Sequence, residues 1–150
     1  MNILLAIDDS PFSRHMLAWL GACGDPFLSR DHRYGVVHAQ TPAPRGLKVL
    51  VDDSELERRR VMEADAVFDP VRTFMHHHGV HATFFAAEGN PSDVIIEHAQ
   101  RLESDLIVMG SHGRSTAGQW ALGSVVSRVL ARTSVPVLVV PPPGAAGTSA

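Results

Sequence analysis

The chain has 150 residues, 45% of them hydrophobic and 19% charged, and its formal net charge is −3. This length and composition predict one globular domain and exclude a disordered or fibrous chain. The negative charge argues against a nucleic-acid or membrane-surface binder, since both classes need a basic surface. Apolar runs are too short to span a bilayer, and the single cysteine, Cys23, excludes an internal disulfide. Because residues 1–8 lack a basic segment, we expect no signal peptide and a cytoplasmic location.

Short apolar runs alternate with amphipathic segments along the chain, which predicts strands alternating with helices. In chain order, strands are expected at residues 3–7, 34–39, 82–87, 105–109 and 137–140. Helices are expected after Ser10-Pro11 as far as the glycines at 21 and 24, and then at residues 52–78, 93–102 and 124–132. Pro70 lies inside the long second helix, where a proline can break or kink it. The composition of residues 141–150 (PPPGAAGTSA) predicts a disordered tail.

This order of elements predicts an open, doubly wound sheet of five parallel strands with helices on both faces. We expect the strand order 3-2-1-4-5. The carboxyl ends of parallel strands lie at one edge, and ligands of such sheets bind there. Asp8, Ala39 and the loop after Met109 are therefore expected around one crevice.

The segment 110–124 (GSHGRSTAGQWALGS) is suited to holding a phosphate group. Gly110 and Gly113 leave backbone N–H groups accessible, and Gly123-Ser124 opens a helix whose first N–H groups favour an anion. Arg114 adds a positive charge. The single lysine, Lys48, lies elsewhere, so a phosphate site here would work without a P-loop lysine. The same glycines are equally compatible with a surface loop and a helix cap.

The spacing Gly110-x2-Gly113-x9-Gly123-Ser124 resembles the nucleotide-binding signature of the universal stress protein family, in its ATP-binding branch. Residues 3–10 (ILLAIDDS) resemble the first strand of that family, and residues 105–113 (DLIVMGSHG) and 134–140 (SVPVLVV) resemble its last two. The resemblance covers residues 2–140 and implies a universal stress protein domain at 1–140, with the Rossmann-like fold of the adenine nucleotide alpha hydrolase-like group.

The resemblance implies a homodimer that binds ATP, with Mg²⁺ or Mn²⁺ held by the phosphates rather than by side chains. Asp8 would contact the adenosine part, the backbone near Ala39 would meet the adenine edge, and the residues from Gly110 onward would line the phosphates. The implied ATP-binding residues are Ala6, Ile7, Asp8, Ala39, Met109, Gly110, His112, Gly113, Arg114, Gly123, Ser124, Val125 and Val126. The dimer would form through the last strand, Val137, Leu138, Val139 and Val140. Asp9 departs from the family pattern, where Gly or Phe is common.

Two classes of function follow. The first is a nucleotide-dependent regulatory or stress-response module with at most slow ATP hydrolysis. The alternative is an ATP hydrolase or a nucleotidyl- or phosphoryl-transfer enzyme that uses His112 and Arg114. We favour the first, because segment 110–124 contains no Asp, Glu or Lys to position water or neutralise charge. We expect His112 to donate a hydrogen bond to phosphate rather than to act in catalysis.

Three further motifs have simpler interpretations. Asp9 and Ser10 are expected to cap the first helix. His76-His77-His78 ends a helix, where consecutive side chains diverge, so we do not favour a metal site there. Arg58-Arg59-Arg60 is interleaved with glutamates, as on a solvated helix face.

Overall fold

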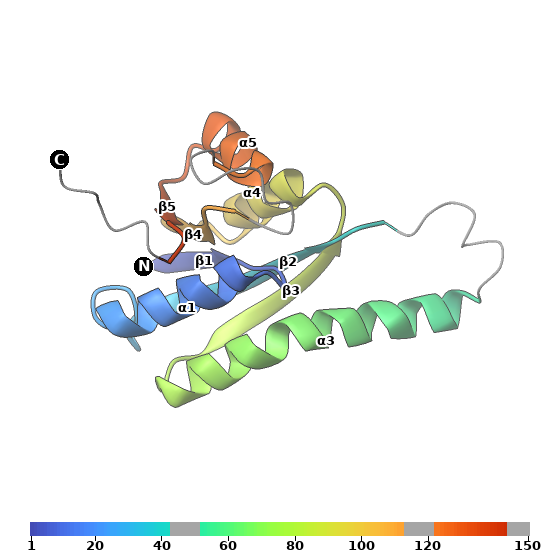
Figure 1. Cartoon of the computed structure of the whole chain (residues 1–150), viewed down its shortest axis with the longest axis horizontal. Coiled ribbons are helices and arrows are strands. Elements are labelled where there is room, and N and C mark those ends of the chain that lie inside the picture. Colours follow the sequence, from blue (N-terminus) through green and yellow to red (C-terminus); the bar gives the residue numbers. More distant parts are fainter. Residues whose placement is uncertain (43–51, 113–121, 144–150) are drawn as a thin grey trace.

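The structure, a computed structural model, describes residues 1–42, 52–112 and 122–143. Strands and helices alternate along the chain (Figure 1). In order they are β1 (Asn2–Ala6), α1 (Pro11–Cys23), β2 (Arg33–Gln40), α3 (Asp53–His77), β3 (Ala82–Glu88), α4 (Pro91–Arg101), β4 (Leu106–Gly110), α5 (Ser124–Arg132) and β5 (Val137–Val140). All pairings are parallel, and the order is β3-β2-β1-β4-β5. The expected five-stranded parallel sheet is thus confirmed.

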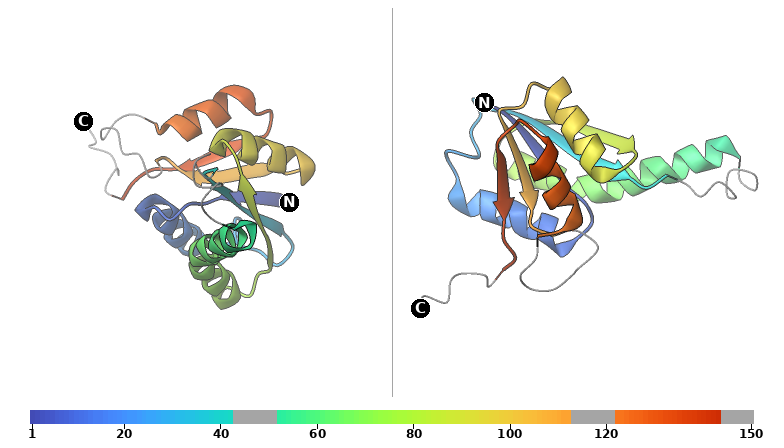
Figure 2. Two further views of the ribbon diagram at one scale, coloured as in Figure 1. Left: turned by 90° about the vertical axis from the view of Figure 1, so that its right-hand side faces the viewer. Right: turned by 90° about the horizontal axis from the view of Figure 1, so that it is seen from above.

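The sheet lies between two layers of helices (Figure 2). Helices α1 and α3 cover one face, where Leu5 and Val36 belong to one buried cluster. Helices α4 and α5 cover the other face, where Leu4 and Val37 belong to a second cluster. Because successive side chains of a strand point to opposite faces, covering both faces makes the central strands continuously apolar.

Helix α1 begins as expected but ends later. The N-cap is Ser10, whose hydroxyl accepts from the N–H of Ser13, and Pro11 follows in the first turn. The expectation that Gly21 helps to close the helix is wrong, because α1 continues through it to a C-cap at Gly24. A Cβ at Gly21 would lie 3.2 Å from atoms of Phe74 and His78. Here glycine allows close packing of α1 on the end of α3.

Helix α3 runs without interruption past Pro70, so the proline does not break it. Val67, Phe68 and Val71 are buried against the sheet on either side of the proline. Burying such side chains stabilises by roughly 1.5–3 kcal/mol each, which offsets a local cost of about 3 kcal/mol for an interior proline. The helix ends at His77 with His78 as its C-cap, and Gly79, which has a φ of +65°, follows directly.

Other boundaries differ from the sequence prediction by one or two residues. Helix α4 begins at Pro91 rather than at residue 93, because the side chain of Asn90 accepts from the N–H of Ser92 and forms the cap. Strand β1 ends at Ala6, and β4 extends to Gly110. In the part of the chain that the structure describes, no helix is long and apolar enough to cross a membrane. Residues 144–150 of the expected tail lie outside the described residues.

Candidate functional site

A cavity of about 250 Å³ lies at the carboxyl edge of the sheet. Strands β1 and β4 end side by side there, since Ala6 pairs with Met109 and, on the other side of β1, with Val37. The described residues that line the cavity are Ala6, Ile7, Asp8, Ser13, Val37, His38, Ala39, Thr41, Pro91, Ile95, Met109, Gly110, His112, Gly123, Ser124, Val125 and Val126. This is the crevice that the topology predicts.

Every predicted site residue that the structure describes lines this cavity. Ala6, Ile7, Asp8 and Ala39 lie at the ends of β1 and β2. The others lie at the end of β4 and at the start of α5. Gly113 and Arg114 lie outside the described residues. Among the described lining residues, Asp8 is the one carboxylate and none is Lys or Arg. That these residues hold a nucleotide stays a prediction.

At the end of β1, Asp8 is held by three donors. Its Oδ1 accepts from the N–H of Ser10 at 3.1 Å, from the hydroxyl of Ser13 at 2.7 Å and from the hydroxyl of Ser10. The N–H of Asp8 in turn donates to Ser13 Oγ at 2.9 Å. The cap of α1 and the position of Asp8 are therefore built from one network, and Ser10 is the N-cap of the helix, as expected.

At the end of β4, Gly110 has a packing role in addition to the predicted one, which stays a prediction. A Cβ there would lie 3.1 Å from Phe12 Cβ and 3.2 Å from its carbonyl oxygen. The first turn of α1 therefore lies against Gly110, and any larger residue would require Phe12 to shift. Two residues on, His112 Nδ1 lies 3.0 Å from Ser111 Oγ, and its ring lies 5.1 Å from that of Phe12. Its Nε2 is buried and has no hydrogen-bond partner within the described structure.

Helix α5 presents its N-terminus to the cavity through Ser124 and Val125. Its N-cap is Gly123, which makes no side-chain cap bond, and its first turn contains no acidic residue. The N–H of Gly123 donates to the Ser111 carbonyl at 2.9 Å, which fixes this helix start beside the end of β4. The first N–H groups of a helix have no intrahelical acceptor and carry a partial positive charge. This end of the cavity is suited to an anion.

Sequence reasoning missed several lining residues, namely Ser13, Val37, His38, Thr41, Pro91 and Ile95. For His38 a signal existed, because it is the polar residue in the otherwise apolar run 34–39 (YGVVHA). Ser13 lies one helical turn after the cap, where a hydroxyl can return to the preceding loop. Pro91 and Ile95 belong to α4, which packs on the sheet face opposite α1 and α3. No local sequence pattern predicts that these two residues reach the cavity.

The remaining polar motifs lie away from the cavity. His76 and His77 are exposed at the end of α3, and His78 Nδ1 lies 2.9 Å from the Phe74 carbonyl. Throughout the described ranges, no three His, Cys, Asp or Glu side chains are grouped as metal ligands. Arg58 and Arg59 are exposed and both pair with Glu55, which confirms a solvated ion-pair face for these two. Arg60 differs from the prediction, because it is half-buried and pairs with Glu88 of β3 as well as with Glu57.

The fold and the position of the cavity define a doubly wound α/β protein with a ligand crevice at the carboxyl edge of its sheet. The model of the universal stress protein family matches residues 1–141. The chain belongs to the universal stress protein family.

Known relatives agree with this assignment. The "Universal stress protein in QAH/OAS sulfhydrylase 3'region" of Thermus aquaticus is 31% identical over 140 residues, which cover 93% of this chain and 97% of that protein. The chain aligns with 32%, 51% and 60% of the lengths of three other curated relatives, from Bacillus subtilis and Methanocaldococcus jannaschii.

Solved structures share the fold. That of MJ0577 from Methanocaldococcus jannaschii has a TM-score of 0.79 at 25% identity, covering 95% of this chain and 96% of that one. A universal stress protein of Archaeoglobus fulgidus in complex with dAMP has a TM-score of 0.64 at 20% identity, covering 93% and 96%. A family protein of Arabidopsis thaliana with AMP bound has a TM-score of 0.67 at 14% identity, covering 99% and 97%.

Proposed function

We propose that this protein binds an adenine nucleotide, ATP, in the cavity between the ends of β1, β2 and β4. The carrying observation is that two features line one cavity: the N-terminus of α5, which has no side-chain cap among the described residues, and His112, whose buried Nε2 has no hydrogen-bond partner among them. Both are suited to phosphate oxygens. The structural relatives with dAMP and AMP bound support adenine as the base. The binding signature at Gly110, Gly113 and Gly123, which defines the ATP-binding branch, remains part of this proposal.

The two ends of the cavity suggest how the ligand is oriented. The phosphates would lie at α5 and His112, with Arg114 adding charge. The base and ribose would lie between Asp8 and Ala39, away from the anion-binding end, because the Asp8 carboxylate repels phosphate. In this orientation the negative phosphates lie at the positive end of α5, and the uncharged base and ribose lie beside the negative Asp8 carboxylate.

A divalent cation would be bound mainly through the nucleotide. Mg²⁺ prefers about six oxygen ligands and keeps several waters. Among the described lining residues, Asp8 supplies the one carboxylate, and one of its oxygens already accepts from Ser10 and Ser13. These side chains do not form a metal site of their own. Phosphate oxygens and water would hold Mg²⁺ or Mn²⁺.

Binding rather than turnover is the proposed activity, with the bound state regulating a stress response. Hydrolysis needs a group that orients water in line with the γ-phosphate. The described part of the cavity offers His112 at its phosphate end and no carboxylate there. We expect turnover well below the ~1–10³ s⁻¹ typical of enzymes. A steady-state rate above about 1 s⁻¹ that disappears in His112→Ala would instead favour the phosphoryl-transfer alternative.

A homodimer through β5 is part of the same proposal. Strand β5 lies at the edge of the sheet, and Val137, Leu138 and Val139 are partly exposed. Pairing two such edges about a two-fold axis covers both. Val139→Asp should give monomers in sedimentation, whereas Thr83→Asp on the opposite edge strand should not. A dimer of unchanged strength in Val139→Asp would contradict this interface.

The binding proposal is tested by calorimetry with ATP and Mg²⁺. Wild type should bind, and Gly123→Val should bind much more weakly, because the added side chain would block access of the phosphates to the first N–H groups of α5. Thermal unfolding of the same variant serves as the control for folding. Equal ATP affinity in wild type and in a folded Gly123→Val would contradict the site.

A further inference from the structure

His38 is a buried histidine that the predicted binding signature does not include. It lies on β2, is 1% exposed and lines the cavity. Its ring meets the ring of Phe68 edge-on, with 6.2 Å between centroids. A buried polar side chain usually has a specific partner, because leaving it without one costs free energy.

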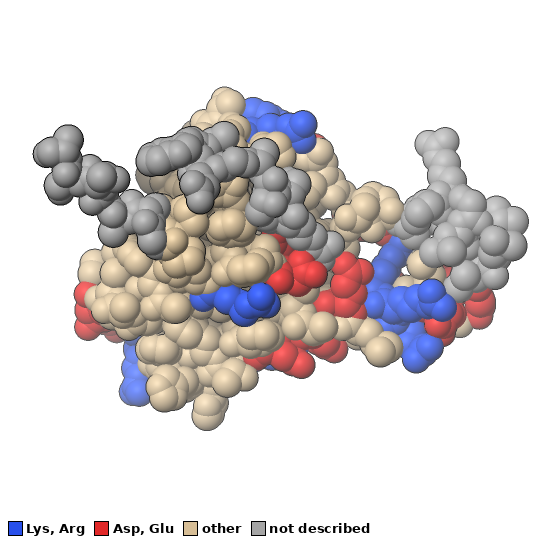
Figure 3. Space-filling model, viewed as in Figure 1, with Lys and Arg blue, Asp and Glu red and all other residues tan. Residues whose placement is uncertain are grey.

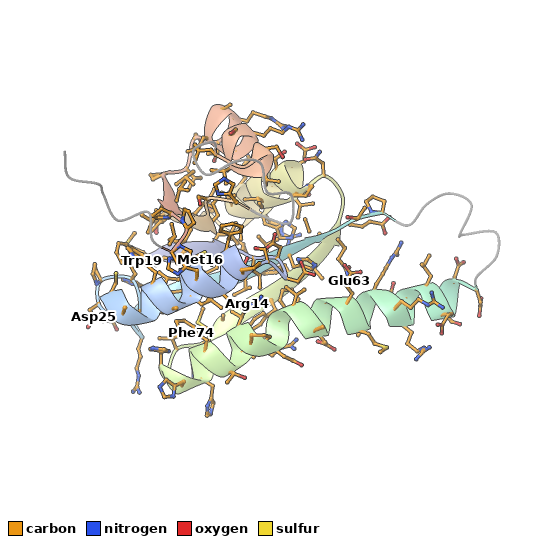
Figure 4. All side chains as sticks on the ribbon, viewed as in Figure 1. Arg14, Met16, Trp19, Asp25, Glu63 and Phe74 are labelled. Atoms are coloured by element: carbon orange, nitrogen blue, oxygen red, sulfur yellow. The ribbon has the colours of Figure 1, made fainter. Side chains whose placement is uncertain are left out.

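The partner of His38 is the backbone of Ile7. Nδ1 lies 3.1 Å from the Ile7 carbonyl oxygen. Since a carbonyl can only accept, Nδ1 must carry the hydrogen in every protonation state of the ring. On the other side of the ring, Nε2 is buried without a hydrogen bond in the described structure, 4.0 Å from Glu63 Oε1. Glu63 points from α3 toward the sheet (Figure 4). Within the described residues, His38 therefore makes its hydrogen bond through Nδ1.

This bond completes the fixation of the peptide group that joins Ile7 to Asp8, which consists of the Ile7 carbonyl and the Asp8 N–H. In the peptide group before it, the N–H of Ile7 donates to the Val37 carbonyl at 3.0 Å. The N–H of Asp8 donates to Ser13 Oγ at 2.9 Å. The remaining polar group, the Ile7 carbonyl, accepts from His38. Strand β2 and helix α1 thus hold the peptide from two sides, directly before the Asp8 side chain enters the cavity.

We propose that His38 is a positioning residue for the adenosine end of the cavity, and that its Nδ1–H sets the placement of Ile7 and Asp8. The inference rests on the proposed nucleotide site. Without this donor the buried Ile7 carbonyl has no partner. The peptide then rotates to find one, and Asp8 moves with it, away from the geometry that binds the ligand. His38 itself need not touch the nucleotide.

Substituting His38 by Asn and by Gln, which both carry a side-chain amide, distinguishes this positioning role from simple packing. The side-chain nitrogen of Asn occupies about the position of Nδ1, whereas that of Gln reaches the position of Nε2. His38→Asn should keep AMP and Mg-ATP affinity within about threefold of wild type. His38→Gln and His38→Leu should bind about tenfold more weakly, which corresponds to the net loss of one buried hydrogen bond.

His98 offers a matched control on the other face of the sheet. It is also buried, and its Nδ1 lies 2.8 Å from the Val94 carbonyl, but it does not line the cavity. The same substitutions at His98 should lower thermal stability without changing nucleotide affinity. A general loss of stability would affect both sets alike.

Hydrogen exchange supplies a readout that needs no nucleotide. The Asp8 amide should exchange faster in His38→Gln than in wild type and should be protected again in His38→Asn. If wild type binds nucleotide and His38→Gln matches His38→Asn in both affinity and Asp8 exchange, the positioning role is wrong while the site stands. If wild type binds neither AMP nor Mg-ATP, the proposed function fails and the inference falls with it.

Discussion

Two of the helices that begin at the cavity, α1 and α5, differ in how their N-termini are satisfied. At α1, the Ser10 hydroxyl accepts from the N–H of Ser13, and the Asp8 carboxylate accepts from the N–H of Ser10 and the hydroxyl of Ser13. These donors at the start of the helix are therefore bonded to side chains of the protein itself. At α5 the cap is a glycine, no side chain among the described residues caps the first turn, and no acidic residue lies in it. The positive end of α1 is thus balanced internally, whereas that of α5 remains for a ligand anion. This difference gives the cavity its polarity.

Gly110 lies where the two helix starts meet, so changing it should have the largest effect. Gly110→Val places side-chain atoms against the backbone of Phe12, which cannot move without shifting α1. Unfolding in urea should show a loss of about 1–3 kcal/mol, typical of overpacking, and nucleotide binding should be lost. Gly110→Ala is the graded control and should fall between wild type and valine. A valine variant of full stability would mean that α1 does not lie against β4.

His112 tests the anion-binding end alone. His112→Ala removes a side chain whose Nε2 has no partner among the described residues, so stability should change little. Affinity for ATP should fall about tenfold, or about 1.4 kcal/mol, since a charge-assisted hydrogen bond to phosphate is lost. Any residual hydrolysis should follow occupancy. Unchanged affinity with hydrolysis abolished would make His112 catalytic rather than an anion-binding residue.

Ser10 tests the internally satisfied end. Ser10→Ala removes the cap of α1 and one donor to Asp8. The expected loss of stability is about 1 kcal/mol, the usual cost of a missing N-cap, and the midpoint of thermal unfolding measures it. Affinity should change less than in His112→Ala. A larger loss of ATP affinity in Ser10→Ala than in His112→Ala would contradict the assigned polarity of the cavity.

The smallest effect is expected far from both helix starts, on the exposed face of α3, where Figure 3 shows acidic and basic side chains side by side. Hydrogen bonds from Arg59 and Arg58 lower the pKa of Glu55 from its usual value. This contribution to stability is present above the ordinary carboxyl pKa and is lost as pH falls through the lowered one. Glu55→Gln should therefore lower the melting temperature slightly at pH 7 and not at all at strongly acid pH. A difference that persists in acid, or in 1 M salt, would exclude the ion pairs as its source.

Much of the architecture could be predicted from the sequence because local patterns encode it. Continuous apolar runs such as 3–7 place the strands, and Ser10-Pro11 places the start of α1. What failed involves a tertiary contact, since Gly21 stays inside α1 where it packs against the end of α3. Pro70 lies inside α3 as predicted, and packing against the sheet offsets its local cost.

The site divides in the same way. The ends of β1 and β4 could be predicted, since topology brings all strand carboxyl ends to one edge. His38 could not be assigned, because its partner Ile7 is 31 positions away and the bond exists only once β1 and β2 are paired. The demand for glycine at Gly110 likewise depends on Phe12, which is distant in sequence.

The central claim is that one cavity binds an adenine nucleotide with its phosphates at α5 and its base near Asp8. A titration of the wild-type protein with Mg-ATP, followed by amide NMR, tests it directly. The account predicts saturable shifts at Ser124, Val125 and Asp8, with no shift at His81 on the opposite edge of the sheet. Saturating ATP that leaves Ser124 and Val125 unmoved, or that shifts His81 instead, would contradict it.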